Sequence, residues 1–181
     1  MNDDYLSRQM EICEDLRAEL RTATANKKFL SLTELLEQLE TKRVNKTLVT
    51  SSGTFLLPHF GHSDYLDKAS SYGDVHVVCL NTDESIRRLG RSPDFVPLHG
   101  RVIFVATHGK VDYVTLFDED TPELILSYLR PNVYAKGEDW AMKLLPERET
   151  VESNGGRIVF IPHTYDFSAS KLVTNIMEKS K

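Results

Sequence analysis

From residue 45 onward, short runs rich in β-branched residues alternate with segments that are long enough to form a helix. The runs are residues 47–50, 75–80, 113–116, 133–135 and 158–161. Strands that alternate with helices pair in parallel, because each helical crossover returns the chain to the same end of the sheet. The alternation therefore predicts an α/β fold whose core is an open, doubly wound, parallel five-stranded sheet.

Two helical segments precede the alternating part. In the first, apolar side chains recur at spacings of three and four, which predicts an amphipathic helix: Leu6, Met10, Cys13, Leu16 and Leu20. In the second, Ser31 and Glu34 form the pattern of a capping box ahead of a leucine stripe. We expect both helices to pack on the main domain or on a second subunit. The predicted organisation is an N-terminal helical arm, residues 1–45, followed by the main domain, residues 46–181.

The charge balance argues against two classes of partner. The 181 residues carry 22 basic and 27 acidic side chains, a formal net charge of −5. Such a chain lacks the basic surface that binds duplex nucleic acid or an anionic membrane, although a small phosphorylated ligand needs only a local positive pocket. No apolar run approaches the roughly 18 residues of a membrane span, and the acidic start is unlike a signal peptide. We therefore expect a cytoplasmic protein without nucleic-acid or membrane partners, its cysteines Cys13 and Cys79 reduced.

A turn with glycines and histidines follows the first predicted strand. It reads Ser-Ser-Gly-Thr-Phe-Leu-Leu-Pro-His-Phe-Gly-His over residues 51–62, and a helix is expected from about residue 63 to 71. In a doubly wound sheet, ligands bind beyond the carboxyl ends of the strands. His59 and His62 are three residues apart and so share one side of a first helical turn. Imidazoles beside the free N–H groups of a helix N-terminus suit a phosphate.

Three other interpretations of this turn compete with phosphate binding. A dinucleotide-binding loop is excluded because the GxGxxG spacing is absent, and a metal pair lacks an obvious third ligand. A helix cap with incidental histidines stays open. His76, His99, His108 and His163 show no partner pattern, and no role is predicted for them.

Helix starts are marked by capping residues. Thr121-Pro122-Glu123 predicts a helix with Thr121 as N-cap and the proline in its first turn, and Ser168 or Ser170 predicts another start. The acidic run at residues 118–120 invites a metal-site interpretation. Its place directly before Thr121 favours instead an interaction of the acids with the helix dipole.

The order of several motifs carries a family resemblance. His59-Phe-Gly-His62 follows a Gly-Thr-Phe turn, and further segments match in the same order: residues 80–89, 97–101, 111–114, 117–122, 129–131, 136–140 and 167–170. The chain resembles the HxGH nucleotidyltransferase superfamily over about residues 31–176, most of all its heptose 1-phosphate adenylyltransferases and its glycerol-3-phosphate cytidylyltransferases. The resemblance implies a Rossmann-like fold, and a homodimer because the family is often dimeric.

The resemblance also implies a reaction. A phosphorylated sugar or similar small acceptor would attack the α-phosphorus of ATP, or of CTP, and expel pyrophosphate, with Mg²⁺ bridging the triphosphate. Its implied catalytic residues are His59, His62, Arg101 and Ser168, of which Arg101 is the favoured anion-binding arginine in a basic stretch at residues 87–110. The residues implied at the nucleotide are Gly53, Thr54, Phe55, His59, Gly61, His62, Arg91, Lys136, Gly137, Asp139, Phe167, Ser168 and Ser170.

Four positions depart from the family pattern. Leu56 stands where an acid is usual after the Gly-Thr-Phe turn, Pro58 replaces a leucine, Arg91 stands in for a lysine, and Ala169 removes a hydroxyl. Two alternatives therefore stay open: a cytidylyltransferase acting on a polyol or amino-alcohol phosphate, and a nucleotide-binding regulatory protein without turnover. The retained histidine pair counts against the second.

Overall fold

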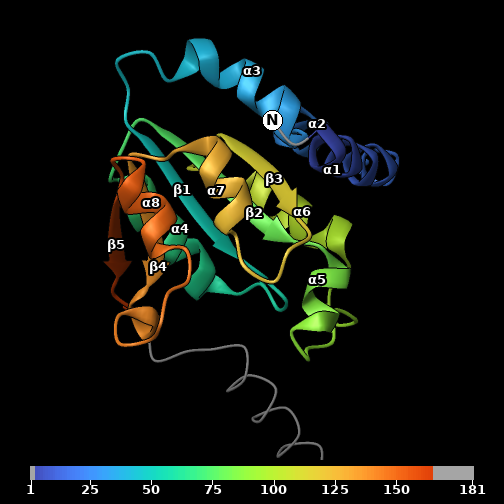
Figure 1. Ribbon diagram of the computed structural model, residues 1–181. Helices are drawn as coiled ribbons and strands as arrows, with labels where there is room; N and C mark the ends of the chain where they lie inside the picture. The colour runs from blue at the N-terminus through green and yellow to red at the C-terminus, as the bar shows by residue number, and fades with distance from the viewer. Residues whose placement is uncertain (1–2, 165–181) are drawn as a thin grey trace, which may run out of the picture.

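The computed structural model describes residues 3–164 (Figure 1). Its centre is a single sheet of five parallel strands in the order β3-β2-β1-β4-β5. The strands are β1 (Leu48–Gly53), β2 (Val75–Asn81), β3 (Tyr113–Phe117), β4 (Val133–Gly137) and β5 (Arg157–Ile161). The prediction of a doubly wound, parallel five-stranded sheet is confirmed, and the strand order reverses between β1 and β4.

Helices cover both faces of the sheet. After β1 they are α4 (Phe60–Ser70), α5 (Asp83–Arg88), α6 (Leu98–Thr107), α7 (Glu123–Leu129) and α8 (Arg148–Ser153), with a 3-10 turn η1 (Glu138–Trp140). Side chains of β2 alternate between two cores: Val78 packs with residues of α4 and α6, whereas Val77 packs with residues of α7. This alternation fits strands that are buried on both faces.

The N-terminal segment forms three helices: α1 (Asp3–Arg17), α2 (Ala23–Lys28) and α3 (Leu32–Lys42). Helices α1 and α3 contact β3, and α2 packs against α6. The Ser31–Glu34 capping box at the start of α3 is confirmed, while the short helix α2 was not expected. Phe29 is fully buried and forms a bridge to Val114 of β3.

The outer edge of β3 is paired with this segment. The backbone N–H of Leu30 donates to the carbonyl of Val114 at 2.9 Å. Two residues along the strand, the carbonyl of Leu116 accepts from the side-chain amide of Gln9 at 3.1 Å. Gln9 is itself held by the backbone N–H of Leu32, which donates to its Oε1 at 2.7 Å.

Two predicted helix starts differ from the structure. Helix α4 begins at Phe60, earlier than expected, because His59 serves as its N-cap. The prediction that Thr121 caps α7 is wrong: Pro122 occupies the N-cap position without a side-chain cap, and the Thr121 hydroxyl donates to Glu123 at 2.6 Å. The predicted start at Ser168 or Ser170 lies outside the described residues.

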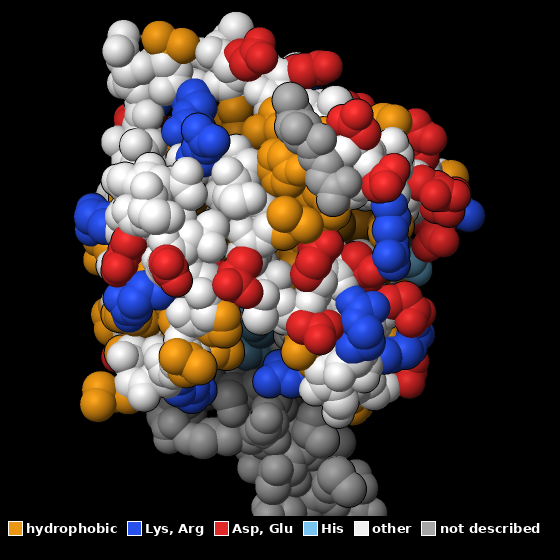
Figure 2. Space-filling model, in the orientation of Figure 1, with side chains coloured by type: hydrophobic (Ala, Val, Ile, Leu, Met, Phe, Trp, Pro, Cys, Tyr) orange, Lys and Arg blue, Asp and Glu red, His pale blue; other side chains and the backbone are white. Residues whose placement is uncertain are grey.

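The surface carries charges of both signs. Figure 2 shows acidic and basic side chains intermingled on the face it presents, without a broad basic region. Across residues 3–164, no helix is long and apolar enough to cross a membrane.

Candidate functional site

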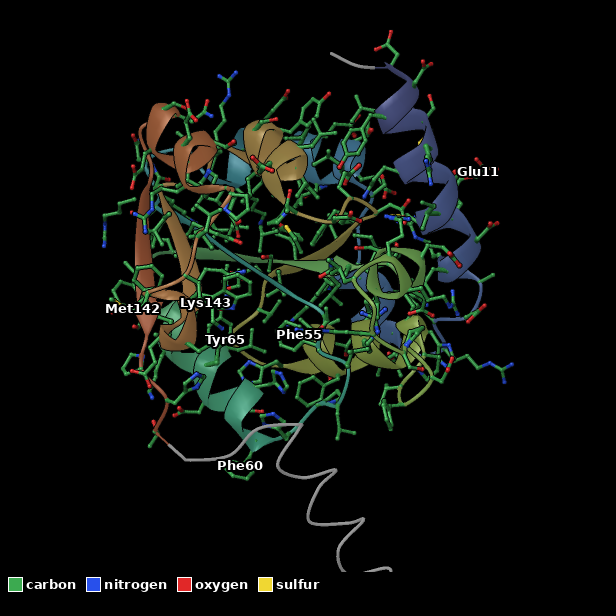
Figure 3. The ribbon with its side chains drawn as sticks, turned by 60° about the horizontal axis from the view of Figure 1, so that its bottom comes forward. Glu11, Phe55, Phe60, Tyr65, Met142 and Lys143 are labelled. Carbon is green, nitrogen blue, oxygen red and sulfur yellow. The ribbon has the colours of Figure 1, made fainter. Side chains whose placement is uncertain are left out.

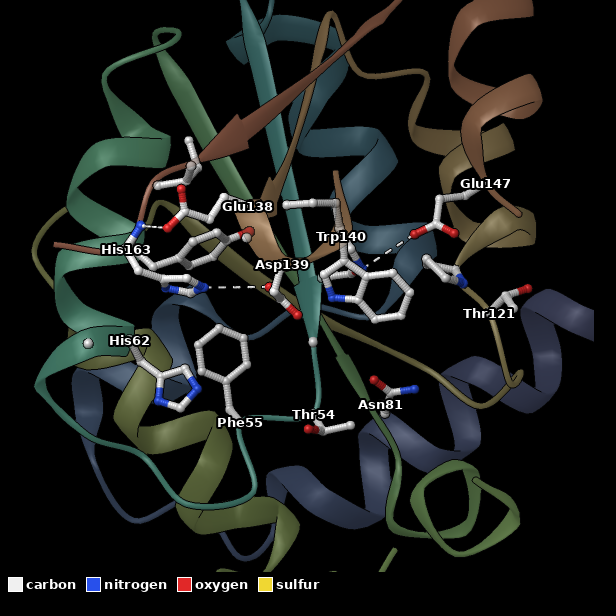
Figure 4. A pocket seen from close by; sticks show the side chains of 18 of the residues that line it. Thr54, Phe55, His62, Asn81, Thr121, Glu138, Asp139, Trp140, Glu147 and His163 are labelled. Carbon is white, nitrogen blue, oxygen red and sulfur yellow. Dashed lines mark hydrogen bonds and ion pairs between the residues drawn. The ribbon is translucent and has the colours of Figure 1, made fainter. Parts of the chain in front are cut away.

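A cavity of about 1160 Å³ opens at the carboxyl ends of the strands. It is lined from the end of β1, the start of α4, the β4–η1 segment and the residues after β5, so it lies at the reversal of strand order (Figure 4). Ligands bind at this place in doubly wound sheets. Figure 3 views the molecule with its bottom turned forward. Phe55, Tyr65 and Lys143 lie on the cavity side in this view, and Glu11 of α1 lies away from them.

The cavity gathers most of the predicted nucleotide-binding residues. Those on its wall are Gly53, Thr54, Phe55, His59, Gly61, His62, Arg91, Lys136, Gly137 and Asp139. Phe167, Ser168 and Ser170 lie outside the described residues. Arg101 is described and does not line the cavity.

In the loop after β1, an unusual backbone conformation at Phe55 places its ring next to His62. Phe55 adopts a positive φ of 48°, which side-chain-bearing residues rarely do, and it is almost fully buried. Its ring lies 4.8 Å from that of His62, centroid to centroid. A Cβ on Gly53 would lie 3.2 Å from the Phe55 ring. Glycine at this position therefore lets the phenylalanine fold back beneath His62.

His59 and His62 are both fixed by the first turn of α4. The backbone N–H of Gly61 donates to Nδ1 of His59 at 3.1 Å, and the backbone N–H of His59 donates to Nδ1 of His62 at 3.3 Å. A ring nitrogen that accepts a hydrogen bond carries no proton, so in the neutral rings the proton is on Nε2. The helix-cap interpretation of this turn is therefore confirmed. The hydrogen bonds of the cap also set the tautomer of both histidines.

Burial keeps the two imidazoles neutral. Desolvation lowers the pKa of His62 to about 4, and the neighbouring His59 contributes in the same direction. Desolvation also lowers the pKa of His59, with a smaller contribution from His163. The site therefore offers two neutral N–H donors at a helix N-terminus, where the helix dipole favours an anion.

Arg101 supports the loop after β1 from the side away from the cavity. It is fully buried on α6, and its Nη1 donates to the carbonyls of Thr54 at 2.7 Å and Asn81 at 2.9 Å. Its Nη2 pairs with Asp83 at 2.5 Å. These contacts join the ends of β1 and β2, so the arginine that the sequence favoured for anion binding holds the cavity wall rather than facing the cavity.

The opposite wall is built around Gly137. A Cβ there would come within 2.6 Å of a carboxylate oxygen of Asp139, so a larger residue would require that side chain to move. Nε2 of His163 lies 3.6 Å from Asp139, and the backbone N–H of His163 donates to Glu138 at 2.7 Å. His163, for which no role was predicted, therefore lines the cavity. Asp139 follows β4 and His163 follows β5, so their contact joins the ends of two strands that are distant in the sequence. No local sequence pattern predicts it.

The charge of the described wall is mixed. Five carboxylates line it, namely Asp64, Asp120, Glu138, Asp139 and Glu147, and the cationic side chains there are Arg91 and Lys136. No group of three acidic, histidine or cysteine side chains in the described part could hold a metal ion. The acidic run contains no such site either, because Asp118 pairs with Arg8 at 2.6 Å and Asp120 with Arg88 at 3.0 Å.

The chain is similar to several known proteins. Residues 51–174 match the cytidylyltransferase-like family. The chain is 40% identical over 161 residues to the D-beta-D-heptose 1-phosphate adenylyltransferase of Bordetella bronchiseptica, covering 88% of this chain and 99% of that protein. It is 40% identical over 154 residues to the bifunctional protein HldE of Campylobacter jejuni, covering 84% of this chain but only 32% of that longer protein.

Two solved structures share the fold. A lipopolysaccharide core biosynthesis protein from Thermoplasma volcanium superposes with a TM-score of 0.56 at 22% identity, covering 67% of this chain and 99% of that one. The pantoate-beta-alanine ligase of Francisella tularensis gives a TM-score of 0.59 at 14% identity, covering 82% and 75%. At these identities the likeness concerns the fold alone.

Proposed function

Because this chain belongs to the cytidylyltransferase-like family, we propose that it is an adenylyltransferase that transfers AMP from ATP to a phosphorylated sugar and releases pyrophosphate. The observation that carries the proposal is the His59–His62 pair, which lines the cavity at the N-terminus of α4. The 40% identity to a named heptose 1-phosphate adenylyltransferase supports the adenylyl donor and the sugar phosphate acceptor.

The reaction requires little proton transfer. A phosphate oxygen of the acceptor forms a bond to the α-phosphorus of ATP, and the bond from that phosphorus to the α–β bridging oxygen breaks with pyrophosphate as the leaving group. Since the attacking phosphate is already ionised, catalysis consists of positioning the groups and neutralising charge. The Nε2–H groups of His59 and His62 donate to phosphate oxygens as negative charge develops on them.

Other residues position the nucleotide. Arg101 fixes the Thr54 carbonyl and so holds the loop under the phosphates. Lys136 supplies a positive charge from the end of β4. The family resemblance implies that Phe167, Ser168 and Ser170, which are outside the described residues, also contact the nucleotide.

Magnesium fits this site as part of the substrate. Mg²⁺ usually keeps several waters and is bound through substrate phosphates with few protein ligands. The described wall has no three-ligand cluster, and its carboxylates outnumber its cationic side chains. Such a wall favours a nucleotide whose charge is already partly neutralised by a bound cation.

Pyrophosphate release from ATP or CTP, measured with a panel of sugar and polyol phosphates, tests the proposal. We expect turnover with ATP and a sugar phosphate. Turnover only with CTP and a polyol phosphate would replace it with the cytidylyltransferase alternative, and nucleotide binding without turnover across the panel would overturn the enzymatic function.

A homodimer and a cytoplasmic location remain predictions. Sedimentation equilibrium would decide the first, with a mass of twice 20.6 kDa expected. Fractionation of the source cells would decide the second.

A further inference from the structure

Four polar side chains form a continuous network beside the cavity, and three of them, Ser52, Lys136 and Glu147, line it. Tyr134 donates its hydroxyl to Oε1 of Glu147 at 2.7 Å, and Nζ of Lys136 lies 3.4 Å from the same oxygen. The hydroxyls of Ser52 and Tyr134 are 2.6 Å apart. Since the only hydroxyl proton of Tyr134 goes to Glu147, Ser52 must donate to Tyr134. The carboxylate is thus linked to β4 through Tyr134, and through Ser52 to β1, independently of the lysine.

Three members of this network are buried, where a charged side chain loses its hydration. Glu147 is 2% exposed, Lys136 8% and Tyr134 fully buried. A buried ion pair seldom adds stability over well-packed apolar side chains, because each charge loses its hydration. Both Lys136 and Glu147 line the cavity, so the pair lies where a substrate would meet it.

We propose that Glu147 is a positioning residue, which holds Lys136 in place as an ammonium ion so that it meets a phosphate of the bound substrate. The inference rests on the proposed function for the identity of that substrate. The protonation state of Lys136 does not depend on the proposed function. Glu147 lies in the loop before α8, in a segment that matched no motif, and Glu147→Gln preserves its shape and an acceptor oxygen for Tyr134.

The groups around Lys136 give the physical reason. Burial lowers the pKa of the lysine, and the carboxylate of Glu147 is the largest opposing influence. Asp139 of η1 also raises the pKa, whereas the ammonium of Lys143 lowers it. The rings of Tyr134 and Trp140 complete its surroundings, at 5.7 Å and 4.5 Å from Nζ to the ring centroids. Removing the charge of Glu147 leaves desolvation and Lys143 opposed only by Asp139.

Trp140 provides a readout that needs no substrate. It is the single tryptophan of the chain, and its ring faces the ammonium groups of Lys136 at 4.5 Å and Lys143 at 4.9 Å. In a Lys143→Met background, the alkaline titration of tryptophan emission is compared with that of Lys143→Met/Lys136→Met, so that the difference follows Lys136 and the quenching by ionised tyrosines cancels. We expect Glu147→Gln to lower its midpoint by about one pH unit or more, and Glu152→Gln, an exposed acid on α8 paired with Arg148, to leave it unchanged. An unchanged midpoint in Glu147→Gln would overturn the proposal.

Kinetics then separate positioning from a general structural role. In Glu147→Gln we expect a near-normal KM for the phosphorylated substrates at pH 6 and a rise of about tenfold by pH 9, with the wild type flatter. Adding Lys136→Arg should return the pH dependence to that of the wild type, because arginine stays charged. A defect that is equal at every pH and persists in the double variant would refute the positioning role.

Two safeguards keep the test decisive. If Glu147→Gln does not fold, Glu147→Asp, which withdraws the carboxylate by one methylene, should lower the emission midpoint by a smaller amount, and no change would count against the proposal. If no substrate is turned over by the wild type, the proposed function fails while the tryptophan titration still decides the role of Glu147.

Discussion

The imidazole rings of His59 and His62 lie with their centroids 4.0 Å apart and their planes inclined by 39°. Each ring accepts a backbone N–H of the helix turn that carries it, so the two side chains act as caps and as a pair of neighbouring Nε2–H donors. One local structure therefore satisfies the helix end and prepares the donors for a developing negative charge.

Replacing His62 with alanine should reduce kcat by about 100- to 1000-fold, because removing one preorganised donor to a developing charge typically has that effect. Steady-state pyrophosphate release measures it, and circular dichroism checks the fold. His108→Ala, a histidine away from the cavity, serves as the matched control. A His62→Ala enzyme with near-normal turnover would show that this ring does not meet the phosphate.

Nucleotide binding should take up protons. The pKa of His62 is about 4 and that of His59 is also lowered, so both rings are neutral in the free protein near pH 7. A bound triphosphate raises both pKa values, and affinity for the nucleotide therefore increases as the pH falls from about 7.5 to 5.5. Calorimetry in buffers of different ionisation enthalpy gives the proton count. Release of protons, or a zero count throughout this range, would contradict the argument.

Arg101→Leu should lower the free energy of unfolding by about 3–5 kcal/mol, since it leaves Asp83 and two carbonyl groups without their buried cationic partner. Urea unfolding measures the loss. Arg87→Leu, which removes an exposed pair with Glu84, should change stability by less than about 0.5 kcal/mol. Equal effects of the two substitutions would argue against the supporting role of Arg101.

Acid should destabilise the fold partly through His76. This buried histidine of β2 lies 2.8 Å from the Ser51 hydroxyl, and desolvation lowers its pKa to about 4. The folded state therefore favours the neutral ring, and the stabilisation present above pH 6.5 is lost as the pH falls toward 4, by about 3 kcal/mol in total. His76→Gln should show a correspondingly shallower decline in unfolding free energy between these pH values. A decline as steep as that of the wild type would assign the acid sensitivity to other groups.

Leu56→Asp should change the preference among phosphorylated acceptors while the KM for the nucleotide stays similar. Leu56 follows the Gly53–Phe55 turn at the position where relatives are expected to carry an acid, and it is half-buried beside the cavity rather than on its wall. Competition between sugar phosphates at fixed ATP measures the preference. A collapse of nucleotide affinity would instead show that this loop position belongs to the nucleotide subsite.

The sequence predicted the sheet and the histidine pair because both are local patterns. Runs of β-branched residues mark each strand, and the spacing of three between His59 and His62 places them on one helical turn. The start of α7 was missed because a proline that suits the first turn can also stand at the N-cap position itself, which Pro122 does.

The remaining parts of the site depend on contacts between distant residues. Arg101 meets the Thr54 carbonyl 47 residues away, and Tyr134 meets Ser52 across 82 residues. No spacing within one segment reveals such pairs, since the same arginine on the other side of α6 would have faced solvent. For Glu147 the sequence offers only a single acid in a loop, and its burial becomes visible when β4 and the loop are in place.

Leu30 and Gln9 donate hydrogen bonds to the carbonyls of Val114 and Leu116. These bonds occupy backbone groups at the β3 edge of the sheet that could otherwise pair with a strand of another molecule. An open edge strand is a template for strand addition, and folded proteins protect such edges against aggregation. Here the N-terminal segment of the same molecule protects the β3 edge, through one backbone amide and one glutamine side chain. Growth of an assembly at β3 would therefore first require displacement of the N-terminal helices, whereas among the described residues β5 is the other edge of the sheet.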